Sequence, residues 1–179
     1  MKRYTKQLEP DLPLLAVDLG YSARSKSCGV AWSGGAVVQS LEFGECIEAV
    51  AQQLSCVGRH TLILEAVLST YHTIEGNPMI RGEFEKGRGW YHGPGVTTFA
   101  AALRFVCELN RVLPDDLRPI PLVEGFLSYK PVRTAHSEDA LRLLVEFDQA
   151  ECFEALPESE PICDLLDGVP QIRRYNKPA

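Results

Sequence analysis

The chain has 179 residues, of which 45% are hydrophobic and 23% charged, and its formal net charge is −6. This composition excludes collagen-like, low-complexity and wholly disordered proteins. Because a chain of this length can bury most of its surface in a single core, we expect one domain over residues 1–148 and an acidic, proline-containing tail over residues 149–179.

Three strands are expected at the start of the domain. Residues 14–19 form a short apolar run that contains Asp18 and ends before Gly20, which is typical of a buried strand followed by a turn. Residues 28–32 and 36–43 predict two further strands, joined by a turn at residues 33–35. Together these segments predict an antiparallel three-strand meander.

Helices and strands alternate in the next part of the chain. Apolar residues spaced by three and four predict a helix from Glu45 to about Gly58. Residues 61–66 repeat the pattern of the first strand, with Glu65 near the end of an apolar run. Residues 96–112 predict a second helix with four inward-facing residues: Phe99, Leu103, Val106 and Leu109.

A strand and a helix complete the expected domain. The strand covers residues 120–126, and His136 to Asp139 open the helix. Four residues of this helix share one face: Ala140, Leu143, Leu144 and Phe147. The order of elements predicts an α/β fold in which a mixed five-stranded sheet is covered by helices on both faces.

A glycine-rich segment without apolar periodicity covers residues 67–95. Loops of this length are usually functional or mobile, and we expect this one to lie beside the functional site. Basic and aromatic residues alternate in it, which suits contacts to phosphate and unpaired bases; the candidates are Arg81, Lys86, Arg88, Trp90 and Tyr91. The same pattern is equally typical of a flap whose aromatic residues pack on the sheet.

Two acids interrupt strands that are otherwise apolar. Burial of an ionised carboxylate is costly unless it is paired or binds a metal, and Asp18 and Glu65 both lie near a strand end, where functional groups of parallel sheets gather. Asp139 lies in the first turn of the last helix. Convergence of the three would predict a divalent metal site with oxygen ligands. Each acid taken singly also has a structural explanation. Asp139 is typical of a helix N-terminus, Glu65 could form a salt bridge at a strand end, and Asp18 before Gly20 is typical of a turn.

The order of these motifs resembles that of the RNase H-like superfamily, and most of all its RuvC-type Holliday junction resolvases. The resemblance is carried by four motifs: Ala16-Val17-Asp18-Leu19-Gly20, the following Gly29-Val30-Ala31-Trp32, Leu62-Ile63-Leu64-Glu65 and His136-Ser137-Glu138-Asp139-Ala140-Leu141. It covers roughly residues 14–148. It implies an RNase H-like three-layer fold.

The resemblance also implies a metal-dependent nuclease. Asp18, Glu65 and Asp139 then match the metal-binding carboxylates, with Asp18 bridging two Mg²⁺ or Mn²⁺ ions, and His136 stands where resolvases often have a catalytic histidine. Glu138 is a candidate for a supplementary acid. Such a site hydrolyses phosphodiester bonds of DNA or RNA by a two-metal mechanism.

The distribution of charge is compatible with a nucleic-acid partner. Residues 1–135 carry 14 basic and 14 acidic side chains, so the acidic end of the chain accounts for the whole net charge. The sequence contains no apolar run long enough to span a membrane and no C-x-x-C motif, so we expect a soluble, cytoplasmic protein with reduced cysteines. A homodimer and a protein partner for the acidic tail stay open.

Two other functions remain as alternatives. One is a catalytically degenerate RNase H-like scaffold that docks proteins or nucleic acids, which would not bind Mn²⁺ at the three carboxylates. The other is a fragment of an actin-like ATP-binding phosphotransferase, because Asp-x-Gly on a first strand also begins those enzymes. Their two domains need a longer chain than this one.

Overall fold

The computed structural model describes residues 12–20, 22, 25–66, 94–118, 120–125 and 134–148. The elements within them are β1 (Leu14–Leu19), β2 (Cys28–Trp32), β3 (Gly35–Leu41), α1 (Phe43–Val57), β4 (Thr61–Glu65), α2 (Pro94–Val112), the 3-10 turn η2 (Asp115–Leu117), β5 (Leu122–Gly125) and α3 (His136–Asp148). The expected tail, and the expected loop up to residue 93, lie outside the described residues.

The five strands form one mixed sheet in the order β3-β2-β1-β4-β5. β2 pairs antiparallel with β1 and with β3, which confirms the expected meander. β4 is parallel to β1 on one side and to β5 on the other. The α/β class and the mixed five-stranded sheet are therefore confirmed. The carboxyl ends of β1, β4 and β5 meet at one edge of the sheet.

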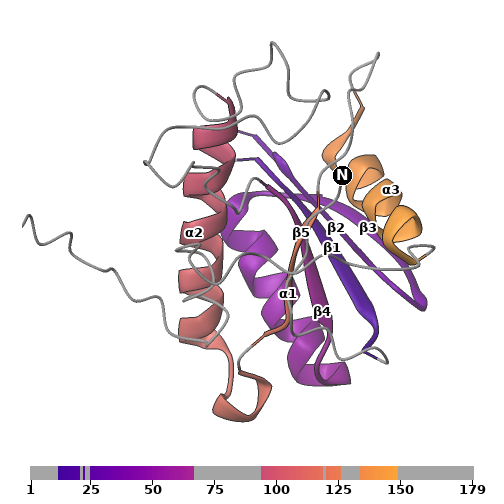
Figure 1. Cartoon of the computed structure of the whole chain (residues 1–179), viewed down its shortest axis with the longest axis vertical. Coiled ribbons are helices and arrows are strands. Elements are labelled where there is room, and N and C mark those ends of the chain that lie inside the picture. Colours follow the sequence, from indigo (N-terminus) through magenta and orange to yellow (C-terminus); the bar gives the residue numbers. More distant parts are fainter. Residues whose placement is uncertain are drawn as a thin grey trace, which may run out of the picture.

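Helices cover both faces of the sheet (Figure 1), and the alternation of side chains along the strands divides the core into two layers. On one face, residues such as Leu15 and Leu62 pack with α1 and α2 in the larger apolar cluster. On the other face, Ala16 and Ile63 pack with α3 in the smaller one. All four α3 residues expected to share a face belong to that cluster, so the expected inner face of α3 is confirmed: Ala140, Leu143, Leu144 and Phe147.

Two helices begin earlier than the sequence predicts. α1 starts at Phe43, which the sequence assigns to the preceding strand, because Glu45 turns back to accept a hydrogen bond from the backbone N–H of Glu42 at 3.0 Å and so caps the first turn. α2 starts at Pro94, so residues 94–95 belong to the helix and not to the expected loop. Proline suits the first position of a helix because its missing N–H needs no partner there.

Phe105 is the largest fully buried side chain of α2, although the sequence does not single it out. Its ring meets that of Phe43 edge to face, with ring centroids 6.2 Å apart. Val106 and Leu109 are buried as expected, whereas Phe99 and Leu103 are only partly buried against the same cluster. The buried stripe of α2 is thus rotated slightly from the expected one.

Two further expectations concern the described part of the chain. The four cysteines in it, of which Cys28 and Cys46 lie in the core, are free thiols. Among the described helices, none combines the length and the apolar character that crossing a membrane requires.

Candidate metal centre

Asp18 and Glu65 lie side by side because their strands are parallel and in register. Asp18 of β1 is the direct partner of Glu65 of β4 in the ladder. In a parallel pair, partnered residues point to the same face of the sheet, so both carboxylates emerge on the face that α3 covers.

The start of α3 brings a third carboxylate to this place, and Gly29 makes the approach possible. Gly29 of β2 is the ladder partner of Asp18. A β-carbon added at Gly29 would collide with the carbonyl group of His136 and would lie 2.6 Å from the backbone nitrogen of Ser137. Because glycine carries no side chain, the first turn of α3 packs directly on β2. Asp139 thereby comes close to Asp18 at the carboxyl end of β1.

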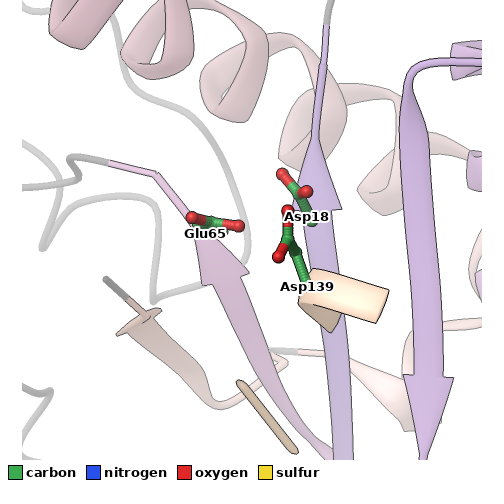
Figure 2. A group of neighbouring side chains, drawn as sticks. All are labelled: Asp18, Glu65 and Asp139. Atoms are coloured by element: carbon green, nitrogen blue, oxygen red, sulfur yellow. The ribbon is translucent and has the colours of Figure 1, made fainter. Parts of the chain in front are cut away.

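The three carboxylates converge on one point, as Figure 2 shows. One ligand oxygen from each of Asp18, Glu65 and Asp139 lies within 4.8 Å of the other two. Only 6% of Asp18 and 3% of Asp139 is exposed, whereas Glu65 is half-buried. The expected clustering of the three acids is confirmed; their chemical role stays a prediction.

Two hydrogen bonds hold two of these carboxylates. The Nδ1 atom of His136 lies 2.7 Å from Oδ2 of Asp18 and donates to it when protonated. The hydroxyl of Thr134 donates to Oδ1 of Asp139 at 2.6 Å. Each of the two acids is therefore oriented by a side chain from the segment that enters α3.

The electrostatics of the site are visible at His136. The hydrogen bond to Asp18 raises the pKa of the imidazole above its usual value, and this outweighs the opposite effect of its partial burial. The charges of Asp18 and Asp139 act in the same direction. The carboxylates thus favour the protonated, positively charged form of the imidazole, which shows that the cluster attracts positive charge.

The residues present fit a divalent cation. Carboxylate oxygens are the ligands that Mg²⁺, Mn²⁺ and Ca²⁺ prefer, and metal–oxygen distances of about 2.0–2.6 Å put two ligands of one ion roughly 3–5 Å apart. The observed spacing of up to 4.8 Å agrees with this range. Close carboxylates also repel one another in the absence of a cation, and a bound ion removes that repulsion.

Other residues expected at the site have different positions. Glu138 is exposed and accepts a hydrogen bond from the backbone N–H of Ala135 at 3.3 Å, so it caps α3 and is not a supplementary acid of the cluster. The candidates for substrate contact lie outside the described residues: Arg81, Lys86, Arg88, Trp90 and Tyr91.

Sequence reasoning assigned no structural role to two residues that shape the site, Thr134 and Gly29. Thr134 precedes a helix, and a threonine there has an ordinary explanation as a cap, so its sequence position carries no signal of a contact with Asp139. Gly29 stands inside an apolar strand, where glycine often marks a close approach of another backbone. That signal was present and identifies the docking position of α3.

The comparisons with known proteins found no match, so the assignment of a function rests on the geometry of the site. No protein-family model matches the sequence, and no curated protein or solved structure matches it either.

Proposed function

We propose that the protein is a divalent-metal-dependent nuclease with an RNase H-like fold. The observation that carries the proposal is the buried cluster of Asp18, Glu65 and Asp139. It is supported by the placement of the acids, two at adjacent parallel strand ends and one at the start of a covering helix. The strand order, with an antiparallel meander followed by parallel strands, also agrees with that fold.

The carboxylates would hold two Mg²⁺ or Mn²⁺ ions, which when bound activate a water molecule and stabilise the leaving oxygen of a phosphodiester. Asp18, Glu65 and Asp139 would hold the ions together, since their ligand oxygens lie within 4.8 Å of one another. The chain itself thus supplies the charge and the fixed geometry that phosphoryl transfer chiefly requires.

His136 would act on the proton of the attacking water or on a phosphate oxygen. One ring nitrogen contacts Asp18, and 38% of the side chain is exposed, so the imidazole connects the cluster to solvent. A histidine oriented through one nitrogen by a carboxylate has its tautomer fixed. Residues 81–91 would supply the basic and aromatic contacts to the nucleic acid.

The test is cleavage of single-stranded, duplex and branched DNA and RNA in Mg²⁺ or Mn²⁺ by the wild type and by Asp18→Asn. We expect the cleavage activity of Asp18→Asn to fall by more than roughly 100-fold, because asparagine keeps the shape of the side chain but not its charge. A loss of about 100-fold is already the upper range when a residue that only contacts a metal ligand is removed. Glu138→Gln removes the same charge beside the site and should cleave like the wild type.

Thermal melts without metal accompany the assay. Above the pKa of His136, where the imidazole is neutral, Asp18→Asn should melt at the same or a slightly higher temperature, since one of three repelling carboxylates is gone. Equal cleavage by the wild type and Asp18→Asn would contradict the proposal. Absence of both cleavage and Mn²⁺ binding in the wild type would favour a docking scaffold.

A further inference from the structure

The side chain of Thr134 contacts Asp139 and does not cap the helix that follows it. Its hydroxyl lies 2.6 Å from Oδ1 of Asp139, within the range of strong hydrogen bonds from a hydroxyl to a carboxylate. The carboxylate that accepts this bond is almost fully buried. A buried acid with such a partner has little rotational freedom.

The first turn of α3 obtains its capping elsewhere. The carbonyl oxygen of Ala135 accepts the N–H of Asp139 at 3.1 Å, so Ala135 occupies the cap position of the helix. The N–H of Ala135 is bonded by the side chain of Glu138 at 3.3 Å. The capping bond at the start of α3 is therefore made by Glu138, whereas the Thr134 hydroxyl donates to the carboxylate of Asp139.

A hydroxyl is well suited to this task. The bond from Thr134 fixes the position of Oδ1 of Asp139 and with it the orientation of the whole carboxylate. Because the donor is neutral, it orients the carboxylate without supplying a positive charge that would compete with a metal, as a lysine or arginine would. Ligand carboxylates in metal sites are commonly held in this way, and loss of the outer partner typically weakens metal binding about 10- to 100-fold.

We propose that Thr134 is a positioning residue that fixes the carboxylate of Asp139 for metal binding. The proposal rests on the function proposed above, because it takes the carboxylate cluster to be a metal site. It goes beyond that function by assigning the preorganisation of the site to a residue that acts through its hydrogen bond to Asp139 and is not one of the three carboxylates. Its consequence is a change in metal affinity and not in the fold.

The test is titration of the full chain with Mn²⁺, followed calorimetrically, for the wild type and three variants at position 134. Thr134→Val keeps the shape and loses the hydroxyl, and we expect its Mn²⁺ affinity to fall about 10- to 100-fold. Thr134→Ala should lose affinity to the same degree. Thr134→Ser keeps the hydroxyl and should bind Mn²⁺ within a few-fold of the wild type.

Melts in EDTA separate positioning from folding. Thr134→Val and Thr134→Ala should melt near the wild type without metal, and the alanine variant serves if the valine variant folds poorly. Wild-type affinity in Thr134→Val, or an equal loss in Thr134→Ser, would overturn the proposal while leaving the metal site in place. Failure of the wild type to bind Mn²⁺, or equal binding by Asp139→Asn, would overturn the proposed function as well.

Discussion

Asp18 combines two contacts that depend on one another. It belongs to the carboxylate cluster, and it accepts a hydrogen bond from His136. When His136 is protonated the pair is an ion pair; when it is neutral the contact is an ordinary hydrogen bond. The stability of the metal-free protein must therefore vary with pH at this residue.

The sign of this variation follows from the raised pKa of His136. A histidine with a raised pKa in the folded protein stabilises the fold fully below its unfolded pKa, about 6.5, and the contribution is lost as the pH rises through the folded pKa. We expect the wild type in EDTA to lose stability over this interval relative to His136→Gln. The effect is small because the side chain is partly exposed.

Urea melts of both proteins from about pH 5.5 to 8.5 measure the difference. His136→Gln keeps a side chain able to donate a hydrogen bond but does not titrate there, so its profile supplies the baseline. Parallel profiles for the two proteins would show that the His136 contact with Asp18 contributes no ion pair to the fold.

Single residues were predictable where they broke a pattern. Asp18 and Glu65 stand out because each is an acid inside an apolar strand, and the cost of burying an unpaired charge demands a partner. Thr134 does not stand out, because the contact that distinguishes it is made across a turn by a residue type that is common before helices. Its role depends on the three-dimensional path of the chain into α3.

At the scale of elements, the position of α3 depends on the small residues beneath it. Ala16 and Ala31 lie in the cluster that α3 joins, and Gly29 lies under its first turn. Small side chains on this face let the helix approach the sheet closely, which places Asp139 beside Asp18. A larger residue at the point of contact would move α3 and with it the carboxylate of Asp139.

Gly29→Ala tests this dependence. Its β-carbon would overlap the backbone of His136, and we expect a loss of about 1–3 kcal/mol or more in the free energy of unfolding together with weaker Mn²⁺ binding. Gly44→Ala is the matched control. Gly44 lies in α1 with no atom near its added β-carbon, so that variant should be unchanged or up to about 1 kcal/mol more stable.

Urea unfolding and Mn²⁺ titration of both variants give the comparison. If Gly29→Ala unfolds and binds Mn²⁺ like Gly44→Ala, the close contact of α3 with β2 does not determine the geometry of the site.

Elements were predicted well in kind and less well at their ends. Short apolar runs identify the described β-strands, and the spacing of apolar residues identifies the described α-helices. The start of α1, however, depends on the bond between Glu45 and the backbone of Glu42. The sequence alone assigns Glu42 and Phe43 to the preceding strand. In α2, several neighbouring apolar stripes are available. The surface of the sheet and the ring of Phe43 decide that the one containing Phe105 is buried.

For the whole molecule, metal binding should appear as added stability, since any ligand that binds the folded state alone stabilises it. At a free Mn²⁺ concentration 100 times the dissociation constant, the gain is about 2.7 kcal/mol, which raises the melting temperature of a chain of this size by roughly 5–10 °C. EDTA should reverse the shift. The Asp139→Asn variant should show none of it.

Differential scanning calorimetry with and without Mn²⁺ measures this shift. An equal rise in Asp139→Asn would place the ion elsewhere on the protein, where the acidic end of the chain offers many carboxylates.

The sheet as a whole was predictable in class and not in detail. The sequence indicates a meander followed by alternating helices and strands, which implies a mixed sheet. The pairing of β1 with β4 in register, which sets Asp18 against Glu65, depends on contacts between distant segments. Such contacts leave no periodic trace in either segment alone.

The three carboxylates belong to two different layers of the fold, so an ion bound by all of them would connect these layers. Asp18 and Glu65 belong to the sheet, whereas Asp139 belongs to the helix that covers it. An ion held by all three would link the helix to the sheet, and its removal would break this link. Because such an ion would bind only the folded chain, the supply of divalent metal would also determine how firmly α3 is held against the sheet.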